Sequence, residues 1–299
     1  MYLQAAVEEG GRHRVDLVDC NIPLALARTI SQDRHDTAPG MVGVTALTPN
    51  LPSVVAAVAT VRDAYPSARV VIGGPHTELF AQETAELQGV DWVLPGEAER
   101  TLPALADMLD DGDAPDLGIL GPTDLGLGEE VALPPVNALP CPQRDRLVWR
   151  LYRGLAGDDV IFATMLSSRG CPHKCTFCST PRGRWRHRDV DAIVQEMEAC
   201  AALGVQHIYF VDDNFPIGGS RLAALCEELI ARPHLPPWSC RTAALGLTEQ
   251  NLEMMRRAGC ARMQLGVETC TAEGLKVLGK TATLEQIQGS FAAARKVGM

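Results

Sequence analysis

Three cysteines stand close together in the second half of the chain, at Cys171, Cys175 and Cys178. Thiolates at this spacing can bind zinc or an iron–sulfur cluster. A structural zinc site needs four protein ligands, and His173 or His187 could supply the fourth. A cubane cluster with only three cysteine ligands instead leaves one iron open to a further ligand. The other seven of the ten cysteines are scattered, which is typical of small buried apolar residues.

The pattern around these cysteines indicates a strand–helix unit that recurs about every 30 residues through the second half of the chain. Four successive units predict a (β/α) barrel or part of one. The cysteines directly follow the first predicted strand, at the end of the barrel where such folds place catalysis. This position favours an open iron–sulfur cluster over a closed zinc site. The predicted strands are 161–168, 207–211, 238–243 and 262–269, and the predicted helices are 189–203, 222–231, 248–257 and 283–297.

The first half of the chain also alternates short apolar runs with helical patterns, which predicts a doubly wound parallel sheet and the α/β fold class. We divide the chain into a Rossmann-type domain at 1–112, a Gly/Pro-rich linker at 113–157 and a partial barrel at 158–299. A fifth barrel strand is expected where the chain stops, and no strand precedes its first helix, so we expect truncation at both ends. The predicted strands are 15–20, 41–47, 69–74 and 90–94, and the predicted helices are 1–9, 51–65, 77–87 and 99–109.

Three turns at the ends of the first domain's predicted strands carry small or polar residues. Glycines such as Gly73 and Gly74 let a ligand approach the backbone closely. Open α/β sheets bind ligands at the carboxyl ends of their strands, where these turns meet. The predicted contact residues are Thr45, Thr48, Gly73, Gly74, Pro75, His76 and Gly96.

The composition of the 299-residue chain is that of an ordinary soluble protein, with 46% hydrophobic and 21% charged residues and a formal net charge of −10. Its most basic run, 182–188, is local, and an acidic chain without a basic stripe does not favour nucleic-acid binding. The chain has no apolar run of about 18 residues, the length that would predict a membrane-spanning helix, and no secretory signal is visible. Ten cysteines in such a chain indicate thiols or metal ligands in a reducing cytoplasm.

The cysteine run has the form Cys-x-x-x-Cys-x-x-Cys with an aromatic residue, Phe177, before the last cysteine. It resembles the radical S-adenosylmethionine (SAM) superfamily. The resemblance implies a [4Fe–4S] cluster whose open iron binds the amino and carboxylate groups of SAM. It also implies that one electron from an external reductant, such as flavodoxin or ferredoxin, cleaves SAM to methionine and a 5′-deoxyadenosyl radical. That radical takes a hydrogen atom from an unactivated C–H bond, while the protein supplies orientation and excludes water.

The same resemblance assigns SAM contacts to residues at the mouth of the predicted barrel. Phe177 corresponds to the residue packed near the adenine, and Asp212 and Asp213 correspond to the acids that contact the methionyl amino group. Arg241 could pair with the carboxylate of SAM, and Glu268 corresponds to the contact with the ribose hydroxyls. Ordinary roles stay open for all five: core packing for the aromatic residue, helix capping for the two aspartates, and ion pairing for the last two.

The Gly-Gly-Pro-His turn at Gly73–His76, the Gly96-Glu97 pair and the downstream cysteines together resemble the cobalamin-binding radical SAM enzymes. Pro140-Cys141-Pro142 resembles their inter-domain segment, so the resemblance covers nearly the whole chain. It implies cobalamin as a second cofactor and, most often, methyl transfer to an unactivated carbon of a small-molecule substrate. No Asp-x-His-x-x-Gly run occurs, so no histidine is assigned as the lower cobalt ligand.

Three other functions stay open. A cobalamin-dependent radical cyclase or rearrangement enzyme fits the same motifs, because the substrate-binding residues cannot be read from the sequence. A methylthiotransferase would carry three cluster cysteines in its first domain, whereas only Cys20 and Cys141 precede Cys171 here. A truncated chain could also bind the cluster without turnover.

Overall fold

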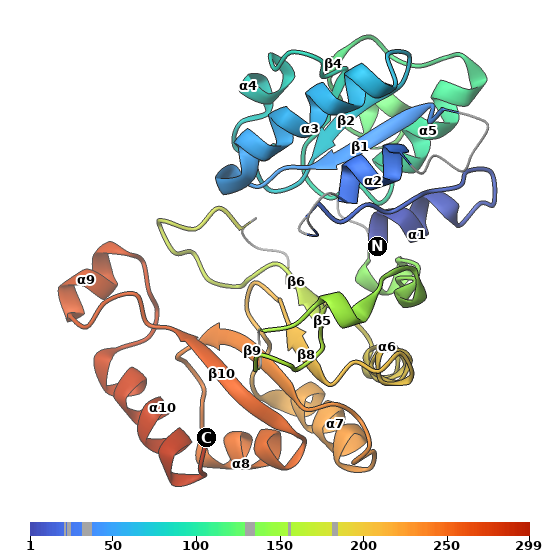
Figure 1. The fold of residues 1–299 in the computed structure, drawn as a ribbon. Coiled ribbons are helices and arrows are strands. Elements are labelled where there is room, and N and C mark those ends of the chain that lie inside the picture. Colours follow the sequence, from blue (N-terminus) through green and yellow to red (C-terminus); the bar gives the residue numbers. More distant parts are fainter. Residues whose placement is uncertain (21, 23–24, 32–37, 129–134, 155–156, 181–184) are drawn as a thin grey trace. The chain divides into compact units, whose positions relative to one another are not determined.

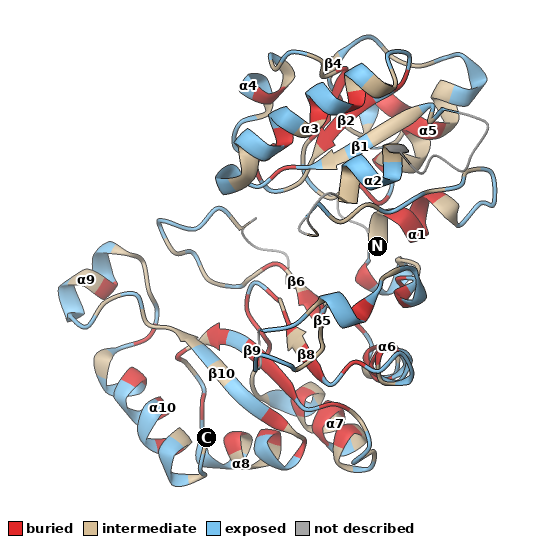
Figure 2. Ribbon diagram, in the orientation of Figure 1, coloured by how far each residue is buried: buried red, intermediate tan, exposed pale blue. Residues whose placement is uncertain are grey.

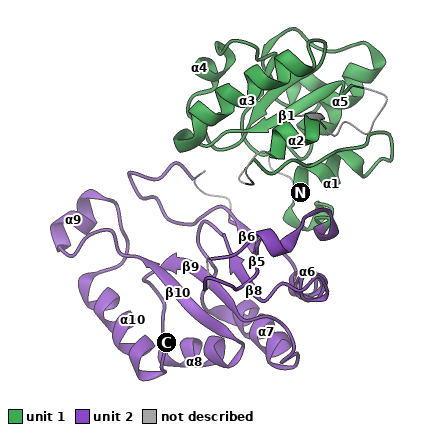
Figure 3. Cartoon of the chain, viewed as in Figure 1, with its two compact units in different colours: residues 1–143 green, residues 144–299 purple. Residues whose placement is uncertain are grey.

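The computed structural model describes residues 1–20, 22, 25–31, 38–128, 135–154, 157–180 and 185–299. They form two compact units, Met1–Gln143 and Arg144–Met299, each with its own parallel sheet (Figure 1, Figure 3). The point of division lies inside the predicted linker at 113–157. Residues 129–134 and 155–156 of that linker, and residues 181–184 around the start of the basic run, lie outside the described residues.

The sheet of the first unit has four parallel strands in the order β1-β2-β3-β4. Its strands are β1 (Met41–Thr45), β2 (Arg69–Gly73), β3 (Trp92–Leu94) and β4 (Gly118–Ile119). Its helices are α1 (Tyr2–Glu8), α2 (Ala25–Ser31), α3 (Leu51–Ala64), α4 (Ala81–Ala85) and α5 (Thr101–Asp111).

Apolar side chains alternate between the two faces of this sheet, as the pleat of a strand requires. On one face Val70 and Ile72 pack in a cluster with buried valines of α3. On the opposite face Val71 packs in a second cluster with Trp92 and with Leu105 of α5. Strands β2 and β3 are largely buried, the edge strand β1 is only partly buried, and α3 is buried along one side (Figure 2). Helices on both faces of a parallel sheet confirm the predicted doubly wound architecture.

Residues 15–20, predicted as a strand, form none, so this prediction was wrong. The Val15 N–H donates to Glu8 Oε1 at 2.9 Å, and the Val15 carbonyl accepts from Gln4 Nε2 at 3.5 Å. Side chains of α1 therefore take the hydrogen bonds that a neighbouring strand would take. Leu17 is 39% exposed, so the segment also lacks the buried face that stabilises a strand.

Of the predicted helix 77–87, only α4 is helical, and it begins four residues later than predicted. Thr77 Oγ1 donates to the carbonyl of Gly74 at 2.8 Å, and this short-range bond holds the backbone in a turn instead of a helix. The structure also has two short helices that the periodicity does not predict, α2 and α9 (Ala272–Val277).

The sheet of the second unit is parallel and open within the described residues, with strand order β10-β9-β8-β5. This arrangement confirms the predicted part of a (β/α) barrel. Its strands are β5 (Phe162–Met165), β8 (His207–Phe210), β9 (Trp238–Ala243) and β10 (Cys260–Gly266), and a small antiparallel pair consists of β6 (Ser168–Arg169) and β7 (Arg186–His187). The remaining helices are α6 (Val190–Ala202), α7 (Gly219–Ile230), α8 (Glu249–Arg257) and α10 (Leu284–Lys296).

The two faces of the second sheet differ sharply in character. One face is apolar, and Trp238 lies fully buried there against the rings of Phe210 and Phe215, with centroids 5.5 Å and 5.3 Å away. The other face carries Arg241 and Gln264, which are both exposed. A polar, accessible face opposite a helix-covered face is what a ligand-binding barrel interior requires. Separately, no helix in the described parts of the chain has the length and apolar character needed to cross a bilayer.

Candidate active site

The cysteine loop, defined here as residues 170–180, begins just after the first strand of the second unit. Gly170 precedes the first cysteine and has φ of +83°, in the left-handed region that favours glycine. The loop then folds so that all three cysteine side chains line one small pocket at the carboxyl end of β5. The residues that line this pocket are Cys171, His173, Cys175, Cys178 and Thr180.

The middle of the loop is fastened to the end of α9. The Thr176 N–H donates to the Leu278 carbonyl at 3.0 Å, and its hydroxyl donates to the Val277 carbonyl at 3.2 Å. A Cβ at Gly279 would lie 3.1 Å from the Lys174 carbonyl. The close packing of these two segments therefore depends on a glycine that no sequence pattern singled out.

The donor set of this pocket fits an open cluster. All three thiols are free, and the Cys178 side chain is exposed. Within the described parts of the chain, no three or more His, Cys, Asp or Glu side chains are placed to hold a single metal ion, so the three thiols line the pocket without converging on one point. Three soft thiolates around an accessible pocket suit an iron–sulfur cubane with one open iron. Burial raises the pKa of the Cys171 thiol, which a bound metal would offset by favouring the thiolate.

The two histidines of the zinc alternative lie in different places. His173 lines the cysteine pocket, and its Nδ1 lies 3.3 Å from Thr281 Oγ1. Burial, and then the charge of Lys280, lower the pKa of His173, which favours the neutral ring. His187 lies on β7, stacks at an angle on Trp185 and is not among the residues that line the pocket.

Two adjacent aspartates after β8 hold the chain around the cysteines. Asp212 is fully buried and accepts hydrogen bonds from the Ser167 N–H at 2.7 Å, the Ser167 hydroxyl at 2.6 Å and the Ser168 hydroxyl at 2.7 Å. Burial raises the pKa of Asp212, while these bonds oppose the rise. Asp213 is exposed and accepts from the Gly170 N–H at 3.0 Å and the Thr180 hydroxyl at 3.2 Å. The predicted contacts of both with the amino group of SAM stay predictions.

Phe177, Arg241 and Glu268 lie on three separate elements. Phe177 is 54% exposed, so it is not a core residue. Arg241 lies over the ring of Tyr209, with its guanidinium carbon 5.8 Å from the centroid. Glu268 lies 3.7 Å from Lys280 Nζ and has φ of +65°. Left-handed backbone in a residue other than glycine is costly and is concentrated at functional sites.

Four charged residues that the sequence did not reveal, three of them buried and Arg221 partly exposed, stabilise the strand end that precedes the cysteines. Glu196 is fully buried and pairs with Arg144 and, at 2.6 Å, with Arg188. Arg144 donates to the Thr164 carbonyl at 2.8 Å, Arg188 donates to the Leu166 carbonyl at 2.8 Å, and Arg221 donates to the Ser167 carbonyl at 3.0 Å. These residues come from distant parts of the chain, so no local signal could have identified them.

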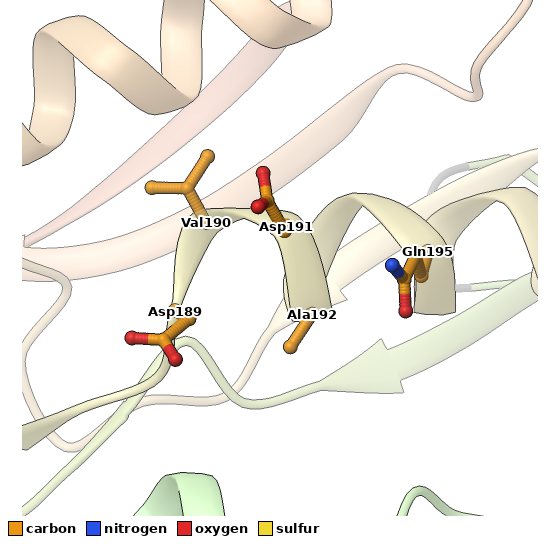
Figure 4. A pocket seen from close by; sticks show the side chains of 5 residues that line it. All are labelled: Asp189, Val190, Asp191, Ala192 and Gln195. Atoms are coloured by element: carbon orange, nitrogen blue, oxygen red, sulfur yellow. The ribbon is translucent and has the colours of Figure 1, made fainter.

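A second hollow lies on the first turns of α6 (Figure 4). Its lining includes two carboxylates, those of Asp189 and Asp191, which point to different sides of the helix in this view. No thiol or imidazole lines it. The cysteine pocket is therefore the candidate centre of the second unit.

In the first unit, the predicted turns do meet at the carboxyl edge of the sheet. Gly74 has φ of +97°, and a Cβ there would lie 2.8 Å from the Ala46 carbonyl, so only glycine lets the two turns approach. His76 is buried; its Nδ1 lies 3.1 Å from Thr48 Oγ1, and its ring stacks on Phe80 at 5.0 Å. These contacts hold the histidine inside the turn, which agrees with leaving the lower cobalt ligand unassigned.

The same edge is accessible and partly apolar. Leu47, Leu79 and Phe80 are 46%, 58% and 37% exposed. A Cβ on Gly96, which has φ of +81°, would meet nothing within 4 Å. An open edge with small residues and exposed apolar side chains fits a large, partly apolar ring system such as cobalamin. Thr45 and Pro75 are exposed at this edge and Gly73 lies beside the Leu94 carbonyl, so all seven predicted contact residues belong to the same three turns.

Family models match both the unit with the cysteine pocket and the unit with the glycine-rich sheet edge. Residues 165–299 match the model of the Radical SAM superfamily, and residues 1–106 match that of the B12 binding domain. The chain therefore combines a B12 binding domain with a domain of the Radical SAM superfamily, the domain pair of the cobalamin-binding radical SAM family. The cofactors of this family are a [4Fe–4S] cluster with SAM in the radical SAM domain and cobalamin in the B12-binding domain.

Curated relatives of this family align with almost the whole chain. An uncharacterized methyltransferase of Pyrococcus horikoshii, PH0819, is 27% identical over 100% of this chain and 66% of its own length. An anaerobic magnesium-protoporphyrin IX monomethyl ester cyclase of Rubrivivax gelatinosus is 26% identical over 95% of this chain and 54% of its own length. The chain therefore spans about half to two thirds of the length of these relatives.

Solved structures share the fold. The radical SAM methyltransferase TsrM of Kitasatospora setae, with cobalamin and a [4Fe–4S] cluster bound, has a TM-score of 0.72 at 18% identity and covers 100% of this chain and 62% of its own. The cobalamin-dependent radical enzyme OxsB with aqua-cobalamin has a TM-score of 0.77 at 19% identity, over 100% of this chain and 45% of its own. These likenesses show the fold alone: an α/β unit with a parallel sheet followed by part of a (β/α) barrel.

Proposed function

We propose that the protein transfers a methyl group to an unactivated carbon of a small-molecule substrate, using SAM, a [4Fe–4S] cluster and cobalamin. The observation that carries the proposal is the gathering of Cys171, Cys175 and Cys178 around one accessible pocket at the carboxyl end of β5. The relative of Pyrococcus horikoshii, which aligns with the whole chain, is named as a methyltransferase. Its name supports this class of reaction over the alternatives.

The protein's own part in such a reaction is to bind and to orient. When bound, the cluster and SAM supply a strong one-electron reductant and a source of radical and methyl groups. The three thiols hold the cluster, and Asp212 fixes the strand end that carries them by accepting three hydrogen bonds. The exposed polar face of the second sheet then receives SAM and substrate beside the loop.

Three of the predicted SAM contacts have a specific geometric support. Phe177 is exposed within the cysteine loop, as a residue stacked on an adenine must be before the ligand binds. Arg241 has an accessible planar guanidinium, which suits a carboxylate. Glu268, two residues beyond β10, has a left-handed conformation and its carboxylate lies beside Lys280, where it can accept from ribose hydroxyls.

One alternative function has a specific observation behind it. Relatives named as anaerobic magnesium-protoporphyrin cyclases align with 95% of the chain, so a cobalamin-dependent radical cyclisation is the second candidate. Either reaction needs an external one-electron reductant, and flavodoxin or ferredoxin is the class we propose. None of the ten cysteines, all of which lie in the described residues, forms a disulfide, which supports a reducing cytoplasm as the compartment.

The two candidates differ in what becomes of SAM. The protein, reconstituted anaerobically with iron, sulfide and hydroxocobalamin, is incubated with methyl-labelled SAM and a reductant. Methyl transfer predicts S-adenosylhomocysteine and loss of label from SAM, because the methyl group leaves the sulfonium. Formation of 5′-deoxyadenosine without any S-adenosylhomocysteine would favour cyclisation and contradict the proposal.

A further inference from the structure

We propose that Asp213 is a positioning residue that ties the two ends of the cysteine loop together, so that the three thiols are gathered before the cluster binds. This inference concerns the loop of residues 170–180 itself. It rests on the proposed function only in taking that loop as the cluster site.

The evidence is a pair of hydrogen bonds to a single carboxylate. Asp213 Oδ2 accepts from the Gly170 N–H at 3.0 Å, immediately before Cys171. Asp213 Oδ1 accepts from the Thr180 hydroxyl at 3.2 Å, two residues after Cys178. The carboxylate therefore bridges the entry and the exit of the loop. Hydrogen bonds to an ionised carboxylate are among the stronger ones that a protein makes.

This bridge lowers the cost of holding the three cysteines around one pocket. Holding three thiols around one pocket fixes a loop whose closure costs conformational entropy. The Thr176 bonds to Val277 and Leu278 fix only the middle of the loop. Asp213 adds the two remaining fixed points, one on each side of the cysteine set. The left-handed Gly170 directs its N–H toward this carboxylate, because the chain turns there.

The neighbouring acid cannot perform this task. Within the described residues, Asp212 accepts its hydrogen bonds from Ser167 and Ser168, before the loop begins, and its side chain is fully buried. Asp212 therefore holds the end of the strand, whereas Asp213 holds the loop. Each oxygen of Asp213 accepts one of these bonds and keeps a second lone pair, so the test must separate this tie from a contact with the amino group of SAM.

The test compares three single variants of the full chain. Asp213→Ala removes both bonds, and Thr180→Val removes only the bond to the loop exit while keeping the shape of the side chain. Asp159→Asn is the matched control, because Asp159 is 98% exposed and lies outside the loop. Hydrogen exchange of peptides covering 167–180 is measured in the cluster-free protein, where no metal can restrain the loop.

We expect exchange in this segment to rise about tenfold in Asp213→Ala, the effect of losing a charge-assisted hydrogen bond, and by less in Thr180→Val. The control should match the parent protein. After anaerobic reconstitution, a chelator should remove iron several-fold faster from Asp213→Ala, while SAM binding measured by equilibrium dialysis changes less than twofold.

The opposite pattern would overturn the proposal. Unchanged exchange and iron loss, with SAM affinity reduced about tenfold, would show that Asp213 contacts SAM and does not tie the loop ends together. If Asp213→Ala does not fold, Thr180→Val alone tests the proposal, and unchanged hydrogen exchange in that variant would contradict the tie between the loop ends. Absence of iron from the parent protein would refute the proposed function, yet the exchange experiment on the cluster-free chain would still test this tie.

Discussion

At the scale of single residues, the chemistry of the site depends on side chains whose partners are fixed by burial. Asp212 shows this most clearly, because a carboxylate without exposed surface must have its lone pairs satisfied inside the protein. The three donors from Ser167 and Ser168 meet that need. The residue therefore stabilises the strand end from which the cysteine loop starts.

Asp212→Asn should lower the free energy of unfolding of the second unit by about 2 kcal/mol, because an amide offers one acceptor oxygen where three donors converge. Urea unfolding followed by tryptophan fluorescence measures the loss. Asp159→Asn, an exposed control, should change the value by less than about 0.5 kcal/mol. Equal effects in the two variants would refute the structural role of Asp212.

The sequence identified the thiols at this scale but not the residues that hold them. Fixed spacing within eight positions marks Cys171, Cys175 and Cys178, since a loop can bring near neighbours together. Glu196 and Arg144 carry no such mark, because 52 residues separate the two partners. Long-range pairs of this kind depend on the fold and are invisible to a local pattern.

At the scale of elements, periodicity and caps predict most helices and strands well. The helix 248–257 appears as α8 with Thr248 as its N-cap, whose hydroxyl accepts from the Asn251 N–H. Residues 15–20 show the limit of the approach, because an apolar run becomes a strand only if a neighbour pairs with it. Here side chains of α1, not a neighbouring strand, form hydrogen bonds with the backbone of Val15.

One carboxylate joins three elements of the first unit. Asp91, just before β3, accepts from Arg62 of α3, from Arg69 at 3.0 Å and from the Val70 N–H at 2.7 Å on β2. Burial acts to raise the pKa of Asp91, but the hydrogen bonds from Val70, Arg62 and Arg69 outweigh burial, so the pKa is lowered. A lowered pKa means that the stabilisation is present above the unfolded-state value and is lost as the pH falls through the folded-state value.

Asp91→Asn should therefore destabilise the first unit by about 2 kcal/mol at pH 7, and the difference from the parent protein should shrink below about pH 3. Urea unfolding at pH 7, 4 and 2 measures the difference above and below this limit. Asp63→Asn, an exposed change on α3, serves as the control. A difference that stays constant across this range would contradict the ionic origin of the effect.

At the scale of the whole molecule, the chain carries two units with separate hydrophobic cores. Each unit also has its own candidate cofactor surface: a Gly-rich sheet edge in Met1–Gln143 and the cysteine pocket in Arg144–Met299. A ligand stabilises the part of a protein that binds it in proportion to the logarithm of its concentration. The two cofactors should therefore act on different unfolding transitions.

We expect calorimetry of the cluster-free chain to resolve two transitions. Hydroxocobalamin at about 100 times its dissociation constant should stabilise one of them by about 2.7 kcal/mol and leave the other unchanged. Gly74→Ala should abolish this shift, because its Cβ would clash with the Ala46 carbonyl. A cobalamin effect on the transition that cluster reconstitution also stabilises would contradict the assignment of the two surfaces.

The central claim is that Cys171, Cys175 and Cys178 hold a redox-active iron–sulfur cluster. The most direct measurement is the metal and sulfide content of the full chain after anaerobic reconstitution, compared with a variant in which these three cysteines are alanine. The account predicts about four irons and four sulfides per chain in the parent protein and almost none in the variant. Zinc without iron in the parent protein, or iron that persists in the variant, would contradict it.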